Sequence, residues 1–165
     1  MRPATLFLDT NILLDCPQPR DYRVSGRRIT LVIIPEVMQE LRGLSRSPGR
    51  GQAGPAIQAF ANLETLARRR GNARGVPVGR SDTRVRVLPG SPKQGSKADL
   101  QLVLMAKVEQ AKHPGELVAV VTKDWGVVDL ARAHGVKSIL LRGRATVADL
   151  ERGIAEHDTV LDIEL

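Results

Sequence analysis

The chain has 165 residues, of which 42% are hydrophobic and 26% charged, so we predict one globular domain over residues 1–165 rather than a disordered segment. A single cysteine, Cys16, excludes an internal disulfide framework and a multi-cysteine zinc site. The absence of any run near 18 apolar residues and of a signal peptide predicts a soluble, cytoplasmic protein that does not enter a membrane.

Segments of strand length alternate with segments of helix length along the chain. The run 4–9 predicts a first strand, and the continuous β-branched run 29–34 predicts a second strand that is buried on both faces. Pro35 suits the first turn of the helix that follows. The predicted strands are 4–9, 29–34, 84–88, 117–122, 138–141 and an edge strand at 160–163, and the predicted helices are 35–44, 55–70, 96–112, 125–134 and 146–154.

This alternation predicts a three-layer α/β/α fold around a central, mainly parallel sheet. The stretches 45–54 and 71–83 have the composition of loops. Both lie within residues 41–98, which hold twelve Lys or Arg against two Asp or Glu, although the whole chain has a net charge of only +7. Such an asymmetry favours a polyanionic partner, and a general bias toward arginine (19 Arg against 6 Lys) is the alternative explanation.

Four acidic residues stand where predicted strands end or predicted helices begin. Ligands of such sheets bind outside the carboxyl ends of the strands, so we expect the four carboxylates at one edge of the sheet. Four carboxylates there would repel one another unless a cation joined them, and oxygen-only ligation favours magnesium or manganese over zinc. The four residues are Asp9, Glu40, Asp99 and Asp124.

Each of these acids also has a structural interpretation. Asp99, three residues after Ser96, fits a capping box, and Asp124 fits the N-cap of the next helix. Glu40 is also typical of a solvated helix residue. Asp9 is hardest to explain in this way, because it lies between two apolar runs, where an unpaired carboxylate is costly.

Four motifs in this order resemble the PIN domain, a family of metal-dependent nucleases: LFLDTN, IPEVMQEL, SKADLQLVLMAKV and VAVVTKDW. The resemblance extends from about residue 4 to residue 141, and the segment 55–70 is similar to the longer PIN variants that are fused to PhoH-type ATPases. The resemblance selects Glu40, rather than Glu36, as the acidic residue of the second motif. Many members carry a further Asp or Asn where this chain has Gly126. The number of metal ions that the site binds, one or two, is therefore left open.

The resemblance implies a metal-dependent endoribonuclease that hydrolyses RNA phosphodiester bonds with magnesium or manganese, and it leaves DNA open as a substrate. A bound ion would lower the pKa of water and so supply the nucleophile. The implied catalytic and metal-binding residues are Asp9, Glu40, Asp99 and Asp124, with Asn11 and Thr122 orienting the carboxylates by hydrogen bonds. The implied RNA-binding residues are Arg46, Arg50, Arg68, Arg69, Arg70 and Arg74.

Other functions fit parts of the sequence. A catalytically silent RNA-binding PIN domain is a non-enzyme alternative, and a haloacid-dehalogenase-type phosphatase would need a second Asp where Asn11 stands. A toxin that acts with an antitoxin partner is a biological role with the same chemistry. A homodimer is a further expectation about assembly. Aromatic residues make up only 2% of the chain, so Trp125, beside Asp124, is the one well-placed candidate for base stacking, with packing as the alternative.

Overall fold

The computed structural model describes residues 2–22, 24, 26–47, 53–69, 75–79, 82–92, 94–95 and 97–164, with only the backbone described for 158–164. Within these residues one six-stranded sheet has the order β3-β4-β2-β1-β5-β6. All neighbours pair in parallel except β3, which runs antiparallel to β4. The strands are β1 (Ala4–Leu8), β2 (Ile29–Ile33), β3 (Val76–Pro77), β4 (Thr83–Val87), β5 (Leu117–Thr122) and β6 (Lys137–Leu140).

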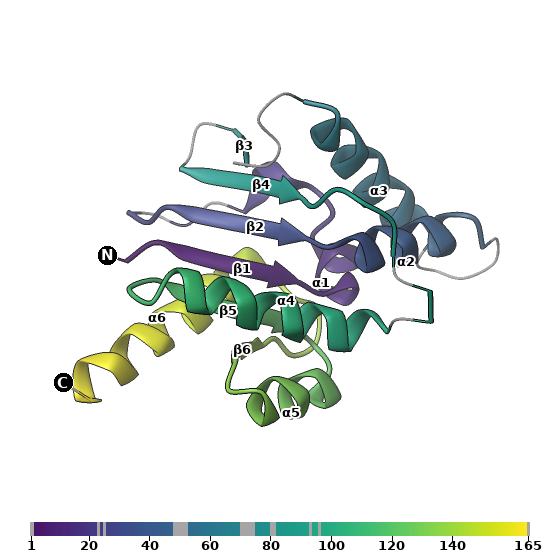
Figure 1. Cartoon of the computed structure of the whole chain (residues 1–165). Helices are drawn as coiled ribbons and strands as arrows, with labels where there is room; N and C mark the ends of the chain where they lie inside the picture. The colour runs from purple at the N-terminus through teal and green to yellow at the C-terminus, as the bar shows by residue number, and fades with distance from the viewer. Residues whose placement is uncertain are drawn as a thin grey trace.

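Helices cover both faces of this sheet, which confirms the predicted three-layer α/β fold (Figure 1). α4 and α5 lie on one face, and α1, α3 and α6 lie on the other, with α2 near the carboxyl ends of the strands (Figure 1). The helices are α1 (Thr10–Asp15), α2 (Pro35–Ser45), α3 (Ala53–Ala67), α4 (Ala98–Lys112), α5 (Trp125–Ala133) and α6 (Val147–Glu164), with one 3₁₀ turn, η1 (Pro19–Asp21).

The core is centred on the neighbouring inner strands β1 and β5, because every residue of both is buried. Their register pairs Leu6 with Ala119 and Leu8 with Val121. Burial on both faces explains why these strands are continuous apolar runs rather than alternating ones. No helix among the described residues is both long and apolar enough to cross a lipid bilayer.

Three elements differ from the sequence-based expectation. The edge strand predicted at 160–163 is wrong, because α6 continues as a helix to Glu164. Leu150 and Ile154, one helical turn apart, are both buried and so favour a helix that packs on the core. The sequence has no Gly or Pro after Gly153, so the helix continues through the β-branched residues that suggested a strand. The predicted loop 71–83 contains the short strand β3, and the helix α1 begins immediately after Asp9.

Candidate active site

Asp9 lies at the carboxyl end of β1, beside the end of β5. Its backbone amide donates to the carbonyl oxygen of Val121 at 3.0 Å, which continues the pairing between these strands. The chain then turns into α1, with Asp9 as the N-cap residue and its Oδ1 accepting from the amide of Thr10 at 2.7 Å. Asp9 is only 5% exposed, so this strand-to-helix turn holds a carboxylate almost inside the core.

The second carboxylate oxygen of Asp9 is held by two side chains. Oδ2 accepts a hydrogen bond from the hydroxyl of Thr122 at 2.6 Å and from the side-chain amide of Asn11 at 3.3 Å. Burial raises the pKa of Asp9 above its ordinary value of 3.8, and the hydrogen bonds from Thr122 and Thr10 lower it only in part. The carboxylate is therefore fixed in orientation but is short of compensating positive charge.

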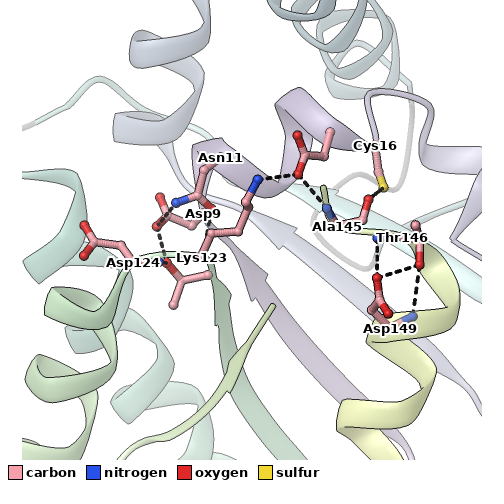
Figure 2. A network of polar contacts seen from close by, with 10 residues as sticks. Asp9, Asn11, Cys16, Lys123, Asp124, Ala145, Thr146 and Asp149 are labelled. Atoms are coloured by element: carbon pink, nitrogen blue, oxygen red, sulfur yellow. Dashed lines mark hydrogen bonds and ion pairs between the residues drawn. The ribbon is translucent and has the colours of Figure 1, made fainter. Parts of the chain in front are cut away.

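Asp124 is connected to Asp9 through the same threonine. The Asp124 amide donates to the hydroxyl oxygen of Thr122 at 3.0 Å, while its Oδ1 accepts from the amide of Gly126 at 2.8 Å. Asp124 is thus the N-cap of α5, as its structural interpretation predicted. Figure 2 shows Asp9, Asn11 and Asp124 close together, just beyond the carboxyl ends of β1 and β5.

Glu40 reaches the same region from α2. Its Oε2 accepts a hydrogen bond from the hydroxyl of Thr10 at 2.6 Å, so the residue that follows Asp9 also fixes Glu40. The negative charge of Glu40 is one of the causes that raise the pKa of Asp9. The structure therefore brings Glu40 next to Asp9, as expected from the sequence.

Asp99 lies in the first turn of α4, whose N-cap is Lys97. Desolvation raises the pKa of Asp99 above 3.8, and the negative charge of Asp124 raises it further, while Lys97 lowers it. Lys97 makes no side-chain capping hydrogen bond, and Ser96, the predicted capping residue, lies outside the described residues. The negative charge of Asp99 in turn raises the pKa of Asp9.

These electrostatic interactions join the four predicted acids into one group, which we call the acidic rim: Asp9, Glu40, Asp99 and Asp124. A pocket of about 320 Å³ opens between α2 and the start of α4, lined by Glu40 and Asp99 together with Glu36, Gln39, Lys97 and Ala98. Within the described part of the chain, no three Asp, Glu, His or Cys side chains are arranged closely enough to hold one metal ion. Two of the four rim acids, Glu40 and Asp99, therefore line an open pocket, and the described acids do not form a closed cage of ligands.

Two neighbours of the rim are not among the predicted site residues, although Glu36 is the alternative to Glu40 in the second motif. Thr10 links Glu40 to the Asp9 turn, and Glu36, which is 6% exposed, lines the pocket one turn before Glu40. The position of Thr10 inside D-T-N was the available signal, because a hydroxyl residue directly after a strand-end Asp lies in a helix-starting turn. A larger pocket of about 580 Å³ lies at the amino ends of the strands, and its lining includes none of the predicted site residues.

Of the six predicted RNA-binding arginines, the structure describes Arg46, Arg68 and Arg69. Arg46 is exposed just past the end of α2, the helix that carries Glu40. Arg68 forms an exposed ion pair with Glu64 at 2.7 Å, and Arg69 lines a separate pocket near β3. That pocket shares no lining residue with the pocket at the acidic rim. The other three, Arg50, Arg70 and Arg74, lie outside the described residues.

Comparison with known proteins supports the resemblance seen in the sequence. Among solved structures, the chain is similar to a domain of a functionally unknown protein from Methanocaldococcus jannaschii DSM 2661, with 17% identity and a TM-score of 0.53 over 86% of this chain and 94% of that one. At this identity the likeness concerns the fold alone. No curated protein matches the chain. A family model described as PIN domain matches residues 6–142, and PIN domains are generally nucleases that typically use magnesium or manganese. The chain therefore belongs to the PIN domain family.

Proposed function

We propose that this chain is a metal-dependent endoribonuclease whose acidic rim holds magnesium or manganese. The observation that carries the proposal is the environment of Asp9. This carboxylate is nearly buried and is oriented by Thr122 and Asn11. Among the described residues, the charges that shift its pKa are the negative charges of Asp99 and Glu40. A protein keeps a carboxylate in such a place at a cost in stability, which is typical of functional sites.

The donor chemistry of the rim fits magnesium or manganese. All its side chains offer carboxylate oxygens, and these metals prefer oxygen over nitrogen and sulfur. Magnesium commonly keeps several waters and takes only one or two carboxylates, so it does not require three protein ligands at one point. Asp9, Glu40, Asp99 and Asp124 are the residues that would hold it. When bound, the ion would supply an activated water near neutral pH and would stabilise charge on the phosphate.

The surrounding residues would orient the site. Thr122 and Asn11 fix the plane of the Asp9 carboxylate, and Thr10 fixes one oxygen of Glu40. Lys97 lines the pocket beside Asp99, where its positive charge would attract a substrate phosphate. The exposed Arg46 would contact phosphates further along the RNA. Phosphate binding stays a prediction for all six arginines named above.

A silent RNA-binding PIN domain is the second candidate. Gly126 stands where many members carry a further Asp or Asn, and the described acids do not converge as a ready set of metal ligands. The phosphatase alternative is less compatible with the site, because Asn11 donates to Asp9 through its amide, and an ionised Asp at that position could not donate. An antitoxin partner and a homodimer stay predictions.

RNA cleavage with matched variants tests the proposal. Structured and unstructured RNAs are incubated with and without manganese, beside Asp9→Asn and a control variant, Glu116→Gln, which changes an acid between α4 and β5, at the amino edge of the sheet. We expect manganese-dependent internal cleavage by the wild type and by Glu116→Gln, and none by Asp9→Asn. RNA binding without cleavage by the wild type, in all metals, would favour the silent binder.

A further inference from the structure

Trp125 is an aromatic side chain on the surface of a protein with few of them. The chain has four aromatic residues, and the structure describes all four. Phe7 and Tyr22 are 2% exposed, and Phe60 is only partly buried but packs against the core. Trp125 is 55% exposed, so it is not a core residue. A single exposed apolar residue needs no explanation by itself, so its surroundings decide what it could do.

The surroundings of Trp125 combine the acidic rim with a cation. Trp125 is the first residue of α5 and directly follows Asp124. The guanidinium carbon of Arg142 lies 5.5 Å from the centre of the indole ring, within the range of a cation–π contact. Arg142 is exposed and follows β6, which is parallel to β5, so both residues lie at the carboxyl edge of the sheet. An aromatic face and a guanidinium therefore meet beside the candidate site.

We propose that Trp125 and Arg142 form a subsite for one unpaired nucleotide of a single-stranded nucleic acid, with the base stacked on the indole and the guanidinium on the adjoining phosphate. Bases in a duplex are already stacked on their neighbours, so only an unpaired base can offer its face to Trp125. Arginine stacks on aromatic faces and binds phosphate in a bidentate manner, which suits both parts of a nucleotide. The inference rests on the proposed nuclease function and narrows its substrate to single strands at this position.

Trp125 provides its own test, because it is the only tryptophan in the chain and its fluorescence reports this position alone. The whole protein is titrated in chelator, which prevents metal-dependent cleavage, with a short single-stranded RNA, the same RNA annealed to its complement, and inorganic polyphosphate. We expect strong quenching by the single strand and little by the duplex or by polyphosphate. Equal quenching by polyphosphate, or binding of the single strand without any change in fluorescence, would overturn the proposal.

Variants separate stacking from charge. Loss of a base–aromatic stack in Trp125→Leu should weaken single-strand binding by about 5- to 150-fold, and Trp125→Phe should restore most of it. Val108→Ala, which changes another exposed apolar residue on α4, should bind as the wild type does. Arg142→Gln should lower the slope of log K against log salt by about 0.7, whereas Arg132→Gln at the far end of α5 should not.

The two proposals fail in different ways. If Trp125→Leu is folded and binds the single strand normally while the wild type cleaves RNA, the subsite is wrong and the nuclease stands. If the wild type binds and is quenched by the single strand but cleaves nothing in any metal, the nuclease is wrong and the subsite stands. If no single strand binds in chelator and the wild type cleaves no RNA in any metal, both are wrong.

Discussion

The hydroxyl of Thr122 connects the residues that end β1 and β5. It donates to Asp9 and accepts from the amide of Asp124, and the residue is 0% exposed. Thr122→Val keeps the shape but leaves both partners short of a hydrogen bond. We expect a loss of about 1–3 kcal/mol in the free energy of unfolding and a large loss of RNA cleavage. Urea unfolding measures the first, and Thr122→Ser, which keeps the hydroxyl, should recover most of both. Wild-type cleavage by the valine variant would contradict the proposed role.

The raised pKa of Asp9 predicts a pH dependence of stability. Because burial favours the neutral acid in the folded protein, the ionised Asp9 lowers the free energy of unfolding above its folded pKa. This cost is absent below the unfolded value near 3.8 and develops as the pH rises through the raised folded pKa. In chelator, Asp9→Asn should therefore be more stable than the wild type at pH 7, and the difference should shrink as the pH falls toward 4. Denaturation of both proteins across this range measures it, and a difference of the opposite sign would mean that the lost hydrogen bonds outweigh the removed charge.

At the residue scale the sequence was informative where one local signal was strong. The costly position of Asp9 between apolar runs marked it as a functional residue. The resemblance to PIN domains implied the orienting roles of Asn11 and Thr122, which both donate hydrogen bonds to Asp9. The contact between Thr10 and Glu40 was not predictable, because it joins two elements whose relative placement depends on the packing of α1 against α2. Residue spacing along one element carries no information about such a contact.

At the element scale, one ion pair joins three segments around the site. Lys123 Nζ lies 2.7 Å from Asp15 Oδ2 at the end of α1, and the same oxygen accepts from the amide of Ala145, before α6. The amide of Lys123 also donates to Asn11 Oδ1 at 3.2 Å, so the pair fixes the loop that carries Asp124 (Figure 2). The side chains are 26% and 20% exposed, which leaves the interaction only partly screened by water.

A double-mutant cycle measures this connection. Lys123→Met and Asp15→Asn should each destabilise the protein, and their coupling energy should fall at about 0.5–3 kcal/mol, as for residues in one hydrogen-bonded network. Because the pair fixes the segment before Asp124, Lys123→Met should also lower the cleavage rate more than RNA affinity. The exposed pair of Arg132 and Asp129, 3.8 Å apart, is the matched control and should show a coupling near zero. Purely additive effects for Lys123 and Asp15 would show that the segments are held by other contacts.

The packing of α6 on β6 depends on a glycine. A Cβ atom at Gly153 would lie 2.5 Å from Cγ2 of Ile139, a distance that requires the helix or the strand to move. Gly153→Ala should therefore destabilise the protein by about 1–3 kcal/mol, although alanine favours helices. Gly43→Ala in α2, where a Cβ would meet nothing within 4 Å, should instead stabilise by up to about 1 kcal/mol. Thermal unfolding of the two variants compares them, and equal shifts would contradict the close approach of α6.

Elements were predictable where the hydrophobic periodicity agreed with the residues that begin or end the segment. The strands 4–9, 29–34 and 117–122 and the helix after Pro35 have both, and the structure contains all of them. The end of the chain has conflicting signals, because its β-branched residues favour a strand, whereas the lack of Gly or Pro after Gly153 allows the helix to continue. Local propensity is a weak guide in such a segment, where packing of Leu150 and Ile154 sets the conformation.

At the scale of the whole molecule, an acidic site lies in a basic protein. The net charge is +7, while the acidic rim collects four carboxylates at one edge of the sheet. The basic remainder would attract a polyanion over a distance set by salt, about 10 Å at 0.1 M, and the rim would repel it at the last step. A divalent cation reverses that local repulsion, so substrate approach and metal binding should favour each other.

The same charge arrangement predicts how metal affects stability. A cation that binds only the folded protein stabilises it by about 2.7 kcal/mol at a hundredfold excess over its dissociation constant. For a chain of this length we therefore expect manganese or magnesium to raise the melting temperature by roughly 5–11 °C. Asp9→Asn should gain much less, because it lacks the central carboxylate, whereas Glu116→Gln, remote from the rim, should gain as much as the wild type. Scanning calorimetry in chelator and in each metal gives the comparison. If Asp9→Asn and the wild type gained equally, the cation would bind elsewhere. If neither gained, the rim would not bind a cation in the folded protein, and the proposed metal site would be wrong.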